Sequence, residues 1–114
     1  MTEGKVLKGD KKGTKLGFPT ANINNKDSVA PGIYAGHVVL GKKTLDAVLY
    51  VGKKRPKILE AHILDFKKSI YGKTIKVEVI EKIRDDEEIS DVGLLKEKIE
   101  KDTMDAWAIL FEHK

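Results

Sequence analysis

Apolar and polar residues alternate with a period of two over much of the middle of this chain. The alternation runs through residues 32–40, 44–51, 58–66 and 73–83, and each segment is rich in β-branched or aromatic side chains. A period of two sends successive side chains to opposite faces, so it indicates β-strands with one buried face. Residues 5–7 form a shorter candidate strand. The pattern predicts a mostly β protein.

The links between these segments are short. Gly41, Lys42 and Lys43 read as a tight hairpin connection, and Tyr71 with Gly72 marks another turn. Consecutive antiparallel strands with such links favour a meander that closes into a barrel, because closure removes exposed edges.

The period changes near residue 90, where a helix is predicted. Ser90 can cap it. One apolar stripe is expected along the helix, with lysine and glutamate on the far side; it is formed by Leu94, Leu95, Ile99, Ala106, Trp107 and Leu110. We expect Trp107, its largest apolar side chain, to pack on the barrel.

Length and composition narrow the class of protein. A chain of 114 residues with 40% hydrophobic and 35% charged residues suits one globular domain, residues 1–114. No apolar run is long enough to cross a bilayer or to act as a signal peptide, so we expect a cytoplasmic protein without a membrane partner. A monomer is expected, although the sequence itself does not determine the oligomeric state. The absence of cysteine excludes disulfides, thiolate metal sites and cysteine nucleophiles.

The net charge of +4 comes almost wholly from lysine, since Arg55 and Arg84 are the only arginines. Nucleic-acid surfaces favour the arginine fork, clustered basic residues and interleaved aromatic side chains, which this chain lacks. We therefore expect no nucleic-acid partner. A modest lysine excess can instead draw an anionic nucleotide toward a pocket.

Residues 4–23, reading GKVLKGDKKGTKLGFPTANI, combine glycines, lysines, a threonine and an asparagine around Pro19. Glycines such as Gly9 can take positive φ and let a polyanion approach the backbone, while lysines neutralise it. The oxygens of Thr20 and Asn22 are hard ligands of the kind that Mg²⁺ accepts. Composition alone leaves a solvated loop open as the alternative. The segment is not a Walker A loop. Gly4 and Gly9 have the spacing of that motif's two glycines, but Asp10 follows Gly9 where the motif requires lysine.

The string Gly-Phe-Pro-Thr-Ala-Asn-Ile at 17–23, with its upstream glycines, resembles the signature of riboflavin kinases (flavokinases). The resemblance continues in PGIYAG at 31–36, LEAHILDF at 59–66, IYGK at 70–73 and IRDD at 83–86, and it covers about residues 3–106. It implies a six-stranded antiparallel Greek-key barrel over about 3–84 with a C-terminal α-helix over about 90–111. It also implies transfer of the γ-phosphate of ATP to the 5′-hydroxyl of riboflavin, giving FMN and ADP, with Mg²⁺.

The same resemblance suggests roles for individual residues. Gly9 and Lys15 match the nucleotide-binding loop, and Thr20 and Asn22 match positions that coordinate Mg²⁺ and the terminal phosphates. Glu60 matches the catalytic carboxylate, which as a general base would accept the hydroxyl proton.

Two further residues near this site keep more than one interpretation. Arg84 matches a position that would contact the flavin ring or the nucleotide, and a surface ion pair with Asp85 or Asp86 is the alternative. His62 competes with Glu60 for the role of base, and we interpret it as a hydrogen-bonded strand histidine.

The chain also departs from the family pattern. The link at 52–60 is shorter than expected, which puts the nucleotide-side contacts in doubt, and Glu87-Glu88-Ile89 stands where a Lys-Phe pair is usual. Bacterial members commonly carry an adenylyltransferase module ahead of this one, and none precedes it here, so FAD synthesis is not expected. The alternative function is a non-catalytic flavin- or nucleotide-binding carrier or sensor, and a barrel that binds single-stranded nucleic acid is less favoured because stacking aromatics are few.

Overall fold

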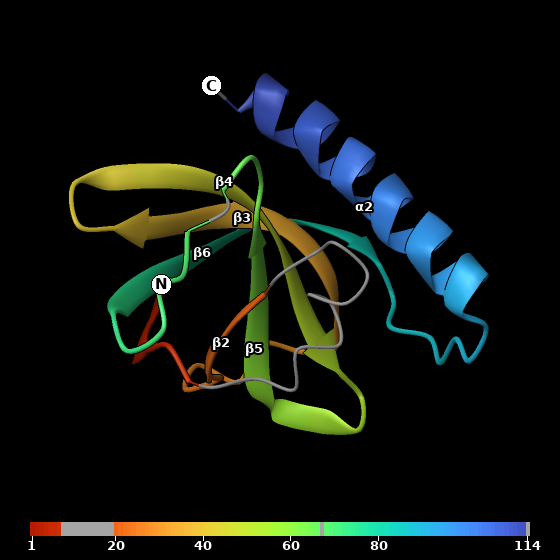
Figure 1. The fold of residues 1–114 in the computed structure, drawn as a ribbon, viewed down its shortest axis with the longest axis horizontal. Helices are drawn as coiled ribbons and strands as arrows, with labels where there is room; N and C mark the ends of the chain where they lie inside the picture. Colours follow the sequence, from red (N-terminus) through yellow and green to blue (C-terminus); the bar gives the residue numbers. More distant parts are fainter. Residues whose placement is uncertain (8–19, 67, 114) are drawn as a thin grey trace.

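A computed structural model of the chain describes residues 1–7, 20–66 and 68–113. These residues form six strands and one helix (Figure 1). In chain order they are β1 (Thr2–Lys5), β2 (Ala21–Asn24), β3 (Gly32–Leu40), β4 (Lys43–Gly52), β5 (Arg55–Ile63), β6 (Thr74–Arg84) and α2 (Val92–Glu112).

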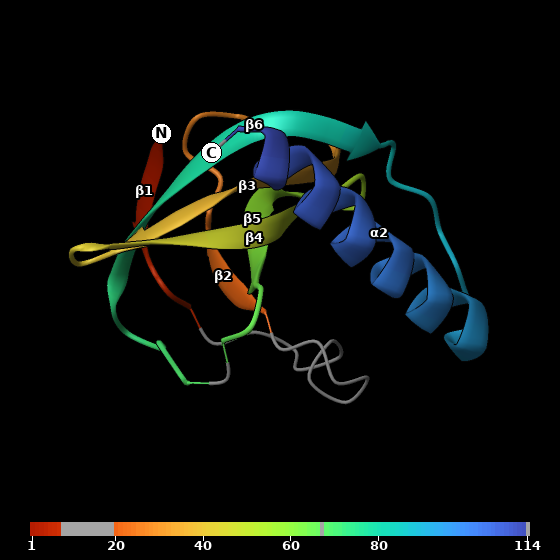
Figure 2. The same ribbon diagram turned by 90° about the horizontal axis from the view of Figure 1, so that it is seen from above.

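The strands form one antiparallel sheet in the order β1-β6-β3-β4-β5-β2. The hairpin-linked strands β3, β4 and β5 are neighbours, and β6 returns to lie beside β3, which is the Greek-key arrangement. The two end strands meet where Leu7 bridges Asn22, whose carbonyl oxygen accepts the Leu7 N–H at 2.7 Å. This contact brings the sheet to near closure (Figure 2). The predicted six-stranded Greek-key barrel with a C-terminal helix is confirmed.

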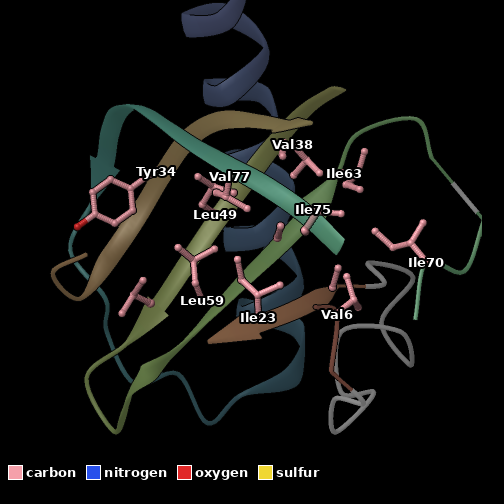
Figure 3. Close-up of a cluster of buried hydrophobic side chains, with 14 residues drawn as sticks. Val6, Ile23, Tyr34, Val38, Leu49, Leu59, Ile63, Ile70, Ile75 and Val77 are labelled. Carbon is pink, nitrogen blue, oxygen red and sulfur yellow. The ribbon is translucent and has the colours of Figure 1, made fainter. Parts of the chain in front are cut away.

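Alternate side chains of the strands point into the barrel and form its core (Figure 3). The alternation seen in the sequence is the cause, because every second residue of a strand faces the same side. Among the fully buried side chains of this core are Ile23, Val38, Leu49, Leu59, Ile75 and Val77.

A second apolar cluster lies on the outer face of the barrel, beneath α2. Ala106 and Leu110 of the helix pack there against Ile33, Ala35 and Val48, together with Leu64. The helix runs across this side of the barrel, against β3, β4 and β6 (Figures 1 and 2). Its N-cap is Asp91, whose side chain accepts the Leu94 N–H, and not Ser90 as predicted.

Several local expectations were wrong. The first strand is Thr2–Lys5 and not residues 5–7, since Leu7 makes only an isolated bridge. Trp107 is 39% exposed and lies outside both apolar clusters, so it is not a main packing residue of the helix. Val79 is also exposed, because irregularities in the pairing of β3 with β6 interrupt the alternation, and Ile80 packs on the outer cluster instead.

Candidate active site

One row of side chains crosses five strands on the outer side of the barrel. In register, Asn22 lies opposite Glu60, Glu60 opposite Tyr50, Tyr50 opposite Ile33, and Ile33 opposite Arg84. Residues directly opposite each other in antiparallel strands share a face and lie within side-chain contact. The pairing therefore gathers residues 22, 50, 60 and 84 along one line, although they are far apart in sequence.

Asn22 supplies a buried acceptor at one end of this row. Its neighbours Ala21 and Ile23 face the inner core, so its own side chain lies on the opposite face. Asn22 is 3% exposed, and its Oδ1 has no hydrogen-bond partner among the residues that the structure describes. Buried polar atoms are nearly always paired, so an orphaned amide oxygen fits a site that a cation or a ligand donor completes.

Thr20 directly precedes β2 and is half-buried. Among the described residues, no three acidic, histidine or cysteine side chains are placed to hold a metal ion. A cation beside Asn22 would therefore take neutral oxygens of Asn22 and Thr20, with phosphate oxygens and water completing its shell. Mg²⁺ accepts hard oxygen ligands of this kind, and it usually keeps several waters and substrate phosphate oxygens in its shell.

Glu60 lies in the middle of the row and faces a cavity of about 380 Å³. Its side chain is 31% exposed, and its Oε1 is 3.7 Å from Nη1 of Arg55. The cavity is formed by the β4–β5 turn, the start of β5 and the β6–α2 loop; its lining residues are Gly52, Lys53, Lys54, Arg55, Ile58, Glu60, Asp86, Glu87 and Glu88. A substrate in this cavity can reach the Glu60 carboxylate.

Polar contacts hold the two loops of the cavity together. The backbone N–H of Lys53 donates to Asp86 Oδ2 at 3.0 Å, and Lys54 Nζ lies 2.8 Å from Glu88 Oε1. The hydrogen bond with Lys54 lowers the pKa of Glu88 and raises that of Lys54. Because Lys54 and Glu88 are both exposed, water screens their attraction, and this ion pair contributes little to holding the loops together.

Arg84 lies at the far end of the row and is fastened to α2. Its Nε and Nη2 donate to the two carboxylate oxygens of Asp102 at 2.8 and 2.9 Å, and its Nη1 donates to the Asp85 carbonyl oxygen at 3.1 Å. The Asp102 hydrogen bond raises the pKa of Arg84. The ion-pair alternative of the sequence analysis was therefore wrong in its partner, because Asp85 pairs with Lys82 and Arg84 with the buried Asp102.

Tyr50 lies between Glu60 and the Arg84–Asp102 pair. Its ring packs against the outer apolar cluster, while its Oη is buried and has no hydrogen-bond partner in the described part of the chain. Burial raises the pKa of Tyr50 strongly, the negative charges of Asp102 and Glu60 add to the rise, and Arg84 opposes it. The sequence analysis missed both Tyr50 and Asp102, since a tyrosine in an alternating strand and an aspartate in a charged helix carry no distinctive signal.

Comparisons with known proteins place this arrangement in a family. A model of the riboflavin kinase (flavokinase) family matches residues 1–110. The chain belongs to the riboflavin kinase family. A bifunctional riboflavin kinase/FMN adenylyltransferase of Bacillus subtilis is 36% identical over 115 residues, which cover 91% of this chain and 36% of that protein. The protein of the same name in Haemophilus influenzae is 40% identical over 114 residues, covering 92% and 37%. The chain thus spans about a third of the length of these relatives.

Solved structures agree on the fold. A crystal structure described as a macrolide-efflux protein from Streptococcus pneumoniae has a TM-score of 0.81 and 30% identity, covering 90% of this chain and 36% of that one. The riboflavin kinase from Trypanosoma brucei has a TM-score of 0.71 and 24% identity, covering 95% and 74%. No helix in the described residues has the length and apolar character needed to cross a membrane.

The family pattern and the structure can be compared residue by residue. Asn22 and Glu60 are direct partners in register, and Thr20 directly precedes β2. Gly9 and Lys15 lie outside the described residues. His62 is half-buried in β5 opposite Val48, and burial lowers its pKa.

Proposed function

We propose that this member of the riboflavin kinase family transfers the γ-phosphate of ATP to the 5′-hydroxyl of riboflavin. The products are FMN and ADP. One observation carries the proposal: Glu60 faces a cavity while its partner in register, Asn22, holds a buried amide oxygen without a hydrogen bond. A carboxylate that can take a proton and an oxygen that can hold a cation are two of the groups that phosphoryl transfer needs.

In the proposed reaction, Glu60 accepts the proton of the riboflavin hydroxyl. The O–H bond breaks as that oxygen bonds to the γ-phosphorus. The bond from the γ-phosphorus to the β–γ bridging oxygen breaks in turn, and its electron pair leaves with ADP. The remaining task of the protein is to hold the two substrates in line and to offset the phosphate charge.

We propose that the N-terminal segment and β2 bind the nucleotide. Gly9 and Lys15 would hold the phosphates through backbone amides and one ammonium group. Thr20 and Asn22 would hold Mg²⁺, which neutralises the phosphate oxygens when bound. The orphaned Oδ1 of Asn22 supports this placement of the metal.

Arg84 is proposed to lie at the flavin end of the site. Asp102 and the Asp85 carbonyl already accept hydrogen bonds from all three of its nitrogens, so its guanidinium is fixed in one orientation. A fixed planar cation offers a face on which a flavin ring can stack. Action as a cytoplasmic monomer, without nucleic-acid or membrane partners, remains a prediction.

The alternative is a carrier or sensor that binds flavin or nucleotide without turnover. A pure binder needs no base, yet Glu60 is accessible from the cavity. The deciding experiment incubates the protein with riboflavin and either MgATP or MgCTP and follows FMN by chromatography. Glu60→Gln is the test variant, and Glu81→Gln, an exposed glutamate of β6, is its matched control.

We expect FMN from the wild type and from Glu81→Gln, and at least about a hundredfold lower kcat for Glu60→Gln. Chelation of divalent metal with EDTA should stop the reaction in every variant. Flavin binding without FMN, with either donor, would favour the carrier or sensor. FMN formation by Glu60→Gln at the wild-type rate would remove Glu60 from the role of base.

A further inference from the structure

Two buried polar atoms that have no hydrogen-bond partner within residues 1–7, 20–66 and 68–113 flank Glu60 in register, one on each side. Asn22 Oδ1 lies on the β2 side and Tyr50 Oη on the β4 side. Orphaned polar atoms are uncommon in folded proteins, and each one calls for an explanation. Two of them beside the same cavity-facing carboxylate point to groups that a ligand completes.

The two atoms differ in chemistry. An amide oxygen only accepts, so it suits a cation or a donor, whereas a phenol can both donate and accept. Tyr50 stays protonated because burial raises its pKa. Asp102, the buried carboxylate near it, already accepts two hydrogen bonds from Arg84. The Tyr50 phenol is therefore a hydrogen-bond donor beside the proposed base, and a hydroxyl group of a substrate could accept its hydrogen bond.

We propose that Tyr50 binds the acceptor substrate, with its hydroxyl donating a hydrogen bond to a hydroxyl of the polyol chain. This inference rests on the proposed function. It gives the site a direction: the metal and phosphates lie on the β2 side of Glu60, beside Asn22, and the acceptor alcohol lies on the β4 side, beside Tyr50. Glu60 then lies between the two substrates, where its carboxylate can take the proton of the acceptor hydroxyl as that oxygen bonds to the phosphorus.

The hydroxyl of Tyr50 is covered in the structure, so the acceptor reaches it only after a local movement. The loop between β6 and α2 is the segment that fits this requirement. It lines the cavity beside Glu60 and follows directly after Arg84. Two exposed contacts join it to the β4–β5 turn, the Lys54–Glu88 ion pair and the hydrogen bond from the Lys53 N–H to Asp86, and both must break for the loop to move away. Water screens the ion pair, so it contributes little.

The test is Tyr50→Phe, which removes one oxygen and keeps the ring in place. Tyr71→Phe is the matched control, because Tyr71 is 65% exposed and lies in the turn before β6. Three quantities are measured for each protein: the Kd of riboflavin by flavin fluorescence titration, the KM values for riboflavin and for MgATP, and the Tm.

For Tyr50→Phe we expect the riboflavin Kd and KM to rise roughly tenfold, as for the loss of one hydrogen bond to substrate. The KM for MgATP should stay within about twofold of the wild type. The Tm should not fall, since the lost hydroxyl had no partner in the free protein. A merely structural hydroxyl would lower the Tm and leave the ratio of the two KM values unchanged.

The inference is overturned if Tyr50→Phe binds riboflavin as the wild type does, or if both KM values rise together. If the wild type makes FMN and Tyr50→Phe has the same riboflavin Kd and KM values, only the proposed role of Tyr50 is refuted. A wild type that neither binds nor phosphorylates riboflavin would remove the proposed function as well.

Discussion

The ion pair between Arg84 and Asp102 should contribute a large share of the attachment of α2 to the barrel. Asp102 is 1% exposed, and its carboxylate accepts two hydrogen bonds from Arg84, at 2.8 and 2.9 Å. Asp102→Ala would leave the guanidinium of Arg84, whose side chain is 21% exposed, without its counter-charge. Removal of one partner of a buried pair costs about 3–5 kcal/mol. Because Arg84 can still reach water on one side, we expect the lower limit, about 3 kcal/mol.

Urea unfolding followed by helix circular dichroism would measure this free energy. At roughly 4 °C per kcal/mol for a domain of this size, the Tm should also fall by about 12 °C. Asp105→Ala is the control on the same helix, because its partner Lys101 is exposed and their pair should contribute less than about 1 kcal/mol. A cycle with Arg84→Met then isolates the coupling between residues 84 and 102. Equal effects of Asp102→Ala and Asp105→Ala, or a coupling near zero, would refute the reasoning.

Three further predictions concern the core, the pH response and the site. Gly36→Ala would place a Cβ 2.3 Å from the Glu78 carbonyl oxygen, so it should cost about 3 kcal/mol in urea unfolding. Gly41→Ala, at φ 61° but in open space, should cost only about 1 kcal/mol. Burial lowers the pKa of His62 below its ordinary 6.5, so the unfolded chain takes up the proton more readily. Stability should therefore fall as the pH drops through 6.5, and urea midpoints from pH 7.5 to 5.5 should fall less steeply in His62→Gln; equal slopes would contradict this. Glu60→Gln should reduce FMN formation and leave the midpoint of urea unfolding nearly unchanged. A much lower urea midpoint would mean that Glu60 is mainly structural.

The middle of the fold could be predicted closely from the sequence. The alternation over residues 32–40 matched β3 at both ends, and the neighbouring strands were located within a few residues. Alternation identifies such strands because one face of each is buried in the barrel. The strand β2, by contrast, has only four residues, Ala-Asn-Ile-Asn, which is too short for a period to stand out.

Other features depended on partners distant in sequence. Asp102 lies among charged helix residues, and only its contact with Arg84 explains its burial. Trp107 was expected to pack on the barrel because of its size, but the helix turns Ala106 and Leu110 toward the outer cluster instead. A side chain's position on a helix is fixed by which face docks, and that is a tertiary property.

The candidate site was only partly accessible from sequence. Family resemblance singled out Asn22 and Glu60, and the register then placed them opposite each other. Nothing in the sequence marked Tyr50, because its significance lies in an unpartnered oxygen and in its position next to Glu60. The register between strands determines such neighbours, and it emerges only when the whole sheet is paired.

The strand order also sets a sequence of events during folding. Thr2 pairs with Val77, so β1 has no ladder partner until the chain has been made as far as β6. The hairpins among β3, β4 and β5 join residues close in sequence and can form early, whereas a pairing across the whole barrel must first overcome the entropy of closing a long loop. We expect β1 to dock last. The N-terminal segment that carries Gly9 and Lys15 follows β1 directly, so both ends of this segment become fixed only in that final step. A nascent chain would then acquire most of its barrel before the segment that we propose to bind the nucleotide is anchored at both ends.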